Sequence, residues 1–226
     1  MKKIFKNLIV LMIVILLTAC TSKDDTVKET QTADPDEQTA EIEHASDKEN
    51  KNRFLVVYFS RTGEQYTVGV IDKGNTAIVA EMIAEITDAD LFEILPMDDH
   101  YPITYSELTD VAKKEQNEKA RPEYSKEVLD LKRYDVIFIG APVWWGDWPM
   151  IMYTFFENNA LSLAGKTLVP FSTHEGSGLS GFDKKLSDVC PESDVAKGLA
   201  MRGNDAQNRQ DNVKESIENW IKELGY

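Results

Sequence analysis

The sequence is poor in cysteine and histidine, and its acidic residues outnumber its basic ones. Its 226 residues include 2 cysteines and 3 histidines, and 25 lysines and arginines stand against 39 aspartates and glutamates. No cysteine-rich or histidine–carboxylate cluster is visible, so the sequence predicts no metal site. A formal net charge of −14 leaves no basic patch to neutralise phosphates, which excludes nucleic acid as an expected partner.

Two enzyme signatures are absent as well. The sequence has no Gly-x-Ser-x-Gly motif, which weakens a hydrolase interpretation, and no dinucleotide-binding fingerprint. Its longest apolar run, Leu8–Leu17, is also shorter than the roughly 20 residues that a membrane-spanning helix needs.

The first 19 residues have the layout of a secretory signal. Three lysines in the first six residues precede Leu8–Leu17, and small residues follow before Cys20. The segment Leu17-Thr18-Ala19-Cys20 resembles the bacterial lipoprotein box, which implies that residues 1–19 are removed and that Cys20 carries the lipid. An ordinary signal peptide with an incidental cysteine is the alternative.

Residues 20–52 are predicted to form a disordered acidic tether. From 21 to 52 there is no aromatic residue and no leucine, so this segment cannot bury enough apolar surface to fold. At about 5–6 Å × √n, a flexible chain of this length places the domain on the order of 30 Å from the bilayer. Loss of the signal's three lysines would change the formal charge to −14 − 3 = −17. We therefore expect an exported protein, lipid-anchored to the cell membrane, with its domain on the extracytoplasmic side.

If Cys20 carries lipid, Cys190 is the only thiol left in the mature protein. An intramolecular disulfide is then impossible, and the core alone must stabilise the domain. We expect Cys190 to be buried and unreactive.

Residues 53–226 alternate between apolar runs and helical patterns. Such an alternation is typical of a three-layer α/β sandwich with a parallel sheet, and its length suits one domain. The predicted strands are Phe54–Phe59, Asp90–Leu95, Asp135–Gly140, Lys166–Ser172 and Asp194–Met201. The predicted helices are Thr76–Ile86, Met150–Leu161, Gly181–Val189 and a final helix whose apolar stripe is Val213, Ile217, Trp220, Ile221 and Leu224.

Two connections are longer than ordinary loops. Glu64–Lys73 separates two parts of a strand-to-helix turn, and Met97–Tyr134 lies between the second and third predicted strands. The longer connection is predicted to carry helices around Tyr105–Glu118 and Tyr124–Lys132. It serves either as a functional lid or as a cover for the sheet edge.

Two loops that follow buried strands predict a ligand with a phosphate and a flat ring. The run Phe54–Phe59 leads into Ser60-Arg61-Thr62-Gly63, and Gly74-Asn75-Thr76 opens the next helix. Hydroxyls and backbone N–H groups at a helix start bind anions, although ordinary turns use the same residue types. Downstream, the loop Pro142–Trp148 offers Trp144 or Trp145 as a flat apolar wall.

These residues, with the turn Ser172–Gly178, resemble the flavodoxin-like family, in its longer branch with a split phosphate loop. The resemblance covers 53–226 and implies a five-stranded parallel sheet of order 2-1-3-4-5, with FMN bound between strands one and three. In short flavodoxins the Asn-Thr pair follows Ser-x-Thr-Gly directly. The insertion Glu64–Lys73 departs from that pattern and allows Tyr66 or Val68 to contribute.

The resemblance also implies roles for particular residues. The glycine peptide Gly146-Asp147 resembles the one that turns toward flavin N5 on reduction in flavodoxins. His174 either donates to a flavin oxygen, relays a proton or has no role, and Arg61 either adds charge near the phosphate or faces solvent. The predicted cofactor-binding residues are Ser60, Arg61, Thr62, Gly63, Tyr66, Gly74, Asn75, Thr76, Pro142, Val143, Trp144, Trp145, Gly146, Asp147, Thr173, His174, Gly176, Ser177 and Gly178.

Three functions remain open from the sequence. The first is a lipid-anchored FMN electron carrier that serves a redox partner protein outside the cytoplasm. The second is an FMN-dependent enzyme that reduces a quinone-like acceptor with a nicotinamide donor. The third is a flavin-free binding lipoprotein that retains only the fold.

Overall fold

The computed structural model describes residues 53–125 and 129–226. The predicted signal peptide, Cys20 and the tether up to residue 52 lie outside the described residues. None of the helices in the described part of the chain is both long enough and apolar enough to span a bilayer.

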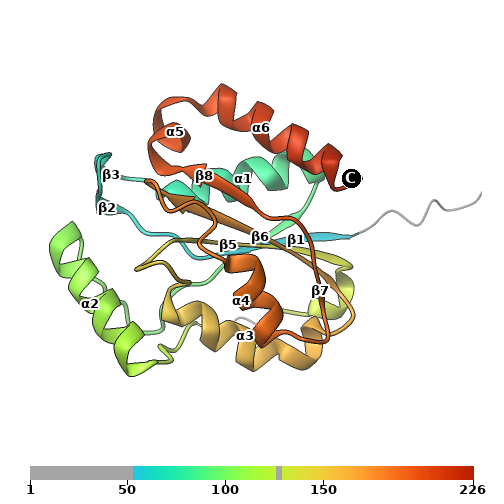
Figure 1. Ribbon diagram of the computed structural model, residues 1–226, viewed down its shortest axis with the longest axis horizontal. Coiled ribbons are helices and arrows are strands. Elements are labelled where there is room, and N and C mark those ends of the chain that lie inside the picture. Colours follow the sequence, from blue (N-terminus) through green and yellow to red (C-terminus); the bar gives the residue numbers. More distant parts are fainter. Residues whose placement is uncertain (1–52, 126–128) are drawn as a thin grey trace, which may run out of the picture. The chain divides into compact units, whose positions relative to one another are not determined.

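A parallel sheet forms the centre of the domain (Figure 1). Its strands lie in the order β4-β1-β5-β6-β7, and β8 also pairs with β6. Numbered along the chain, this is the predicted order 2-1-3-4-5. The strands are β1 (Phe54–Tyr58), β4 (Asp90–Glu93), β5 (Val136–Pro142), β6 (Thr167–His174), β7 (Asp194–Val195) and β8 (Leu199–Arg202).

The fifth position of the sheet holds two short strands rather than the single predicted one. β7 pairs with the start of β6 and β8 with its end. The Leu168 carbonyl still accepts the Ala196 N–H at 2.9 Å. Pro170 of β6 points its backbone toward the same neighbouring strand, but it has no N–H to donate. The hydrogen bonding between β6 and that neighbour is therefore interrupted at Pro170. A Cβ on Gly198 would lie 2.8 Å from the Pro170 carbonyl oxygen, and only glycine fits at this break.

The residues of β1 alternate between two hydrophobic cores, as a strand buried on both faces requires. Leu55 and Val57 belong to the core beneath α3 (Met150–Leu163) and α4 (Phe182–Val189). Val56 and Tyr58 belong to the core on the opposite face. Helices α1 (Asn75–Thr87), α5 (Gly203–Asn208) and α6 (Gln210–Glu223) cover that face (Figure 1).

The predicted stripe of the final helix is confirmed, except at its end. Val213, Ile217, Trp220 and Ile221 are buried, whereas Leu224 follows the last residue of α6 and packs only partly. Cys190 is buried as expected, and burial raises the pKa of its thiol to about 11.

Part of each long connection lies at the carboxyl end of the sheet. The shorter one folds into an antiparallel hairpin of β2 (Gly63–Gln65) and β3 (Gly69–Ile71). The longer one contains α2 (Tyr105–Glu118), as predicted, and this helix lies beside the hairpin (Figure 1).

The second helix predicted in the longer connection, Tyr124–Lys132, is wrong. Tyr124 is paired in an extended bridge with Pro96, and the Ser125 N–H donates to the Leu95 carbonyl at 2.7 Å. Because this backbone bonds to the chain beyond the edge strand, no helix starts here. Among the described residues of this range, the single helical turn is η1 (Leu131–Arg133).

Candidate functional site

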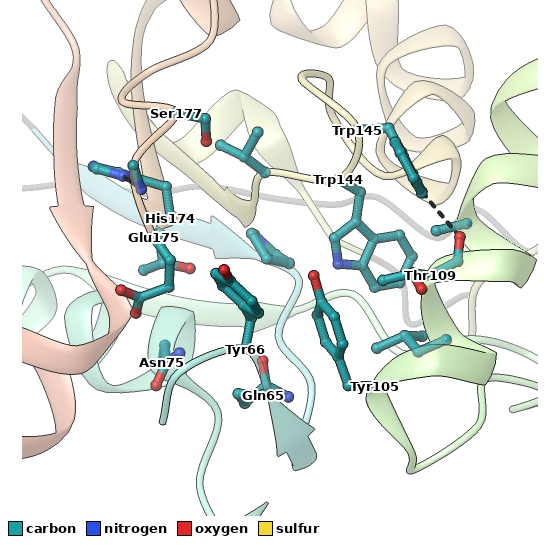
Figure 2. Close-up of a pocket in the computed structure, with 16 residues that line it drawn as sticks. Gln65, Tyr66, Asn75, Tyr105, Thr109, Trp144, Trp145, His174, Glu175 and Ser177 are labelled. Atoms are coloured by element: carbon teal, nitrogen blue, oxygen red, sulfur yellow. Dashed lines mark hydrogen bonds between the residues drawn. The ribbon is translucent and has the colours of Figure 1, made fainter. Parts of the chain in front are cut away.

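A pocket of about 380 Å³ opens at the carboxyl end of the sheet (Figure 2). This volume lies within the range of small-molecule sites. We call the ends of β5 and β6 with the loops that follow them and the start of α1 the inner wall, and the hairpin with α2 the outer wall. The lining residues are Gln65, Tyr66, Asn75, Tyr105, Leu108, Thr109, Ala112, Pro142, Val143, Trp144, Trp145, Thr173, His174, Glu175, Gly176 and Ser177.

The structure brings about half of the predicted site residues to this pocket. Those that line it are Tyr66, Asn75, Pro142, Val143, Trp144, Trp145, Thr173, His174, Gly176 and Ser177. Those that do not line it are Ser60, Arg61, Thr62, Gly63, Gly74, Thr76, Gly146, Asp147 and Gly178. Val68, the alternative to Tyr66, does not line it either.

Ser60 and Gly74 shape the start of α1 rather than the pocket surface. The Ser60 Oγ accepts the N–H of Ala77 at 3.0 Å, which caps the first turn of the helix. A Cβ on Gly74 would lie 2.1 Å from that Oγ and 2.6 Å from the Arg61 carbonyl oxygen, so only glycine fits. The hydroxyl proton of Ser60 remains free to donate.

Thr76 and Thr173 join the start of α1 to the end of β6. Both are buried, and their Oγ1 atoms lie 2.7 Å apart. One hydroxyl proton makes this bond and the other remains available. Among the described residues, the N–H groups of Asn75 and Thr76 have no hydrogen-bond partner. Two free amides at the N-terminus of a 13-residue helix are an anion site by dipole and geometry.

Arg61, Thr62 and Gly63 lead away from this anion site into the hairpin. The Arg61 guanidinium donates to both carboxylate oxygens of Asp99 at 2.8 Å and to the Tyr101 carbonyl at 3.0 Å. The solvent-facing alternative for Arg61 is therefore wrong, because its side chain is only 12% exposed and secures the loop before α2. Thr62 is exposed outside the pocket, and a Cβ on Gly63 would lie 2.6 Å from the Ile103 carbonyl oxygen.

Trp144 and Trp145, the two predicted wall residues, both line the pocket but have different surroundings. Trp144 packs edge-on against Phe59 and Tyr101, with ring centroids 5.4 Å and 5.3 Å apart. It is a fixed aromatic surface of the inner wall. Trp145 is 53% exposed and lies at the rim, toward α2 (Figure 2).

The residues Trp144–Asp147 form a tight turn, which we call the tryptophan turn. Trp144 and Asp147 exchange two backbone hydrogen bonds of 3.0 Å. The central residues have φ values of 51° at Trp145 and 74° at Gly146, as a type I′ turn requires. A bulky side chain at positive φ is an outlier that costs about 1–3 kcal/mol.

Contacts with α2 hold Trp145 in this unfavourable conformation. Its indole N–H donates to the Thr109 carbonyl at 2.9 Å, and its own carbonyl accepts from Gln116 Nε2 at 3.2 Å. The Lys113 ammonium lies 4.9 Å from the centre of the ring. The tryptophan turn is therefore tied to the outer wall.

Gly146 and Asp147 face away from the pocket. The Gly146 carbonyl accepts from Lys185 Nζ at 2.6 Å. Asp147 Oδ1 accepts from the Trp148 N–H at 2.8 Å and from the Tyr153 hydroxyl at 2.9 Å, and lies 3.2 Å from Lys185 Nζ. The Asp147 carboxylate thus stabilises the loop and its charge is paired.

His174 and the turn after it complete the inner wall. His174 Nδ1 accepts the Gly176 N–H at 2.9 Å, so the ring proton is on Nε2 and is free to donate. Burial lowers the pKa of His174, which keeps the ring neutral near pH 7. Gly178 contributes through its carbonyl, which accepts the Ser172 hydroxyl at 3.1 Å.

Sequence reasoning missed most of the outer wall. Tyr105 stacks on Tyr66 with centroids 5.5 Å apart and planes at 28°. The missed lining residues are Gln65, Tyr105, Leu108, Thr109, Ala112 and Glu175. The apolar face of Tyr105–Glu118 could have indicated that the lining residues on this helix are buried against something. It does not indicate which part of the molecule the helix covers.

Glu175 is the one acidic residue that lines the pocket. Its Oε1 accepts the Asn204 N–H at 2.7 Å, and its buried Oε2 has no hydrogen-bond partner in the described part of the chain. Arg202 lies 3.7 Å from Oε2. Glu175 directly follows His174 in the predicted turn, so its position in the sequence could have predicted that it lines the pocket.

Two of the solved structures that resemble this chain come from Bacteroides species, and the match covers almost all of each. One, from Bacteroides uniformis ATCC 8492, is 30% identical with a TM-score of 0.59, and the match covers 76% of this chain and 98% of that one. The other, from Bacteroides eggerthii DSM 20697, is 28% identical with a TM-score of 0.61, covering 77% and 99%. A flavoprotein in complex with FMN from Lactobacillus acidophilus NCFM shares the fold at 22% identity, with a TM-score of 0.54 and coverage of 71% and 99%.

A search among curated proteins finds no match. The family model for flavodoxin matches residues 53–223, which is nearly the whole of the domain that carries the pocket. This chain belongs to the flavodoxin family.

Proposed function

We propose that this protein is an FMN-dependent electron carrier, anchored to the cell membrane by a lipid on Cys20 and active outside the cytoplasm. The observation that carries the redox assignment is the pocket itself. It places an anion site at the start of α1, the helix that follows β1 in the chain, beside a fixed aromatic surface, Trp144, in the loop that follows β5. That is the position at which this fold binds its ligand.

FMN is the cofactor that fits these residues. The free N–H groups of Asn75 and Thr76, with the remaining hydroxyl proton of the Thr76–Thr173 pair, would hold its phosphate. Gly74 permits this arrangement at the start of α1, since a Cβ there would overlap Ser60 Oγ and the Arg61 backbone. Trp144 and Tyr66 would hold the ring, and bound FMN supplies one- and two-electron transfer.

Other lining residues would orient the ring and exclude water. His174 Nε2–H is a free neutral donor on the inner wall. The stacked pair Tyr66–Tyr105 covers the pocket from the outer wall, and the indole of Trp145 lines its rim beside α2 (Figure 2). Water exclusion strengthens each hydrogen bond within the site.

The proposed location rests on the sequence. The basic start, the short apolar run and Leu17-Thr18-Ala19-Cys20 together support export and lipidation. An acidic domain would gain little from the membrane surface itself, so the lipid would supply the attachment.

One observation favours a second candidate, an FMN-dependent reductase of quinone-like acceptors. The surface that α2 contributes to the pocket is uncharged and largely apolar, with Tyr105, Leu108, Thr109 and Ala112. Such a surface suits a flat neutral acceptor. An electron carrier needs no such cover.

The experiment uses the full-length protein purified in detergent. Its visible spectrum and the extracted chromophore identify the cofactor, and recovery of FAD or a colourless protein that rejects FMN would contradict the proposal. Titration with dithionite and then with NADPH, with and without a quinone, separates carrier from reductase. Fractionation of cells that express Cys20→Ala tests the anchor, since an unlipidated protein should leave the membrane fraction.

A further inference from the structure

Lys185, on α4, contacts both loops that follow the central strands. Its ammonium group lies 2.6 Å from the Gly146 carbonyl oxygen, 2.9 Å from the Ser180 carbonyl oxygen and 3.2 Å from Asp147 Oδ1. The side chain is only 31% exposed. A lysine ammonium has three N–H donors, and three oxygens surround this one.

The two loops joined by Lys185 carry opposite parts of the inner wall. Gly146 and Asp147 belong to the tryptophan turn, which presents Trp144 and Trp145 to the pocket. Ser180 belongs to the segment Glu175–Gly181, which we call the glycine loop. This loop directly follows His174 and presents Gly176 and Ser177.

Beyond the sheet, little backbone pairing holds these loops together. The hydrogen bond from the Val143 N–H to the Thr173 carbonyl, 2.9 Å long, is the last between them in the described part of the chain. Both loops also contain non-glycine residues at positive φ, Trp145 at 51° and Ser180 at 52°. Loops with such conformations persist only when contacts around them hold them in place.

We propose that Lys185 is a positioning residue for the flavin, which sets the spacing between the tryptophan turn and the glycine loop. This inference rests on the proposed function, because the spacing matters only if a flat ring lies between the two loops. Lys185 is not among the residues that line the pocket, and it acts through Gly146, Asp147 and Ser180.

The neighbouring lysine provides a matched control. Lys184 is 78% exposed and bonds Asp188 one turn further along the same helix, at 2.7 Å. Lys184→Met and Lys185→Met change the net charge by the same amount and remove an ammonium from adjacent positions. A difference between the two variants therefore reports the contacts of Lys185 and not the overall charge.

The first measurement is FMN affinity, with the absorption and circular dichroism of bound FMN at saturation. Hydrogen bonds that involve charged groups contribute enough that Lys185→Met should raise the Kd about tenfold or more. Lys184→Met should leave the Kd and both spectra unchanged. Lys185→Arg keeps a cation and N–H donors, so it should lose less affinity than Lys185→Met.

The second measurement uses the apoprotein and needs no flavin. Release of the tryptophan turn should increase acrylamide quenching of tryptophan fluorescence in Lys185→Met but not in Lys184→Met. If wild type binds no FMN, the proposed function fails whatever these variants show.

Two results would overturn the role of Lys185 alone. One is equal affinity and equal spectra for the two methionine variants. The other is a loss of affinity that merely follows a loss of folding stability, with the spectrum of saturated FMN unchanged, since that would be a structural role. If Lys185→Met does not fold, the comparison of Lys185→Arg with Lys184→Arg decides between the same outcomes.

Discussion

The inner and outer walls of the pocket are held in different ways. The inner wall continues paired, buried strands, and close approaches such as that of Gly74 to Ser60 fix its shape. The outer wall is attached to the inner wall by individual side-chain contacts. Among them are the hydrogen bonds from the Trp145 indole N–H to the Thr109 carbonyl at 2.9 Å and from Gln116 Nε2 to the Trp145 carbonyl at 3.2 Å.

This difference has a consequence for function. Long-range strand pairing gives the inner wall a geometry that changes only with the fold, whereas a helix attached by a few side chains can open locally at a low free-energy cost. We therefore expect the inner wall to determine whether FMN binds and the outer wall to determine how fast it enters and leaves. The predictions below test this division.

The largest effect should come from Gly74→Ala. The added Cβ would overlap Ser60 Oγ and the Arg61 backbone, at 2.1 Å and 2.6 Å, so the start of α1 must shift. We expect a loss of about 3 kcal/mol in the free energy of unfolding and no measurable FMN binding. Urea unfolding and a flavin titration measure both.

Gly146→Ala is the control for Gly74→Ala. Its added Cβ meets nothing within 4 Å, and the only cost is a φ of 74°. It should lose about 1 kcal/mol and retain FMN. Equal losses in the two variants would show that close packing at Gly74 is not what shapes the site.

The next effect in size should come from Thr76→Val, which keeps the shape but removes a hydroxyl. It leaves the buried Thr173 hydroxyl without its partner at 2.7 Å and removes one donor from the anion site. We expect the Kd for FMN to rise about tenfold in both the oxidised and the reduced protein.

Thr62→Ala serves as the comparison, because Thr62 is exposed outside the pocket. It should bind FMN as wild type does. A large effect of Thr62→Ala would mean that the loop before the hairpin closes on the phosphate when FMN binds, and would place part of the anion site on the outer wall.

A smaller effect should come from Tyr105→Ala on the outer wall, which removes the stacked partner of Tyr66. We expect FMN association and dissociation both to become several-fold faster while the Kd changes less, because the cover opens and the inner wall is intact. Stopped-flow fluorescence of FMN measures these rates. Leu161→Ala, at a side chain that is 96% exposed, is the control. If Tyr105→Ala changes the Kd as much as Thr76→Val does, the two walls are not separable.

The smallest effects should be those of pH on the free energy of unfolding. His174 in the inner wall and His100 beside the outer wall should change this free energy with pH in opposite directions. Burial lowers the pKa of His174 below 6.5. The native state then binds fewer protons than the unfolded state, so the contribution of His174 to stability is present above pH 6.5 and is lost as the pH falls through its folded pKa.

His100, in the loop before α2, behaves in the opposite way. Burial opposes its protonation, but hydrogen bonds to Glu115 and to the Asp98 carbonyl, with both carboxylates nearby, outweigh burial and raise its pKa above 6.5. Its contribution is present below pH 6.5 and is lost as the pH rises through the folded pKa.

Unfolding free energies measured between pH 5 and pH 8 test both signs. His174→Gln should flatten the profile of unfolding free energy against pH on its acidic side. His100→Gln should flatten the same profile on its alkaline side. A profile unchanged by either substitution would contradict the two assignments.

Much of the inner wall was predictable from local sequence. Apolar runs followed by Ser, Thr, Gly and Trp place polar and aromatic residues at the carboxyl ends of parallel strands, and Asn75, Trp144, Thr173 and His174 do line one pocket. Ser60, Thr76 and Gly146 were predicted as cofactor contacts, but none of them lines the pocket. Ser60 Oγ accepts from Ala77, Thr76 Oγ1 bonds Thr173 and the Gly146 carbonyl accepts from Lys185. Only donors such as the Thr76 N–H are left for a ligand. Residue types reveal which groups can form hydrogen bonds, but not which partner each group bonds in the folded protein.

The sequence by itself determined which segments form the strands and the residue types of the pocket's inner wall, because hydrophobic period and turn residues are local properties. The strand order was implied by the resemblance to the flavodoxin-like family and not by these local patterns. Only the tertiary structure decided what α2 covers, where Arg61 points, and that Lys185 joins two loops. These depend on contacts between residues far apart in the chain, such as Arg61 with Asp99 and Trp145 with Thr109. The insertion after Gly63 moved the chain toward α2, and no local pattern specifies where a hairpin docks.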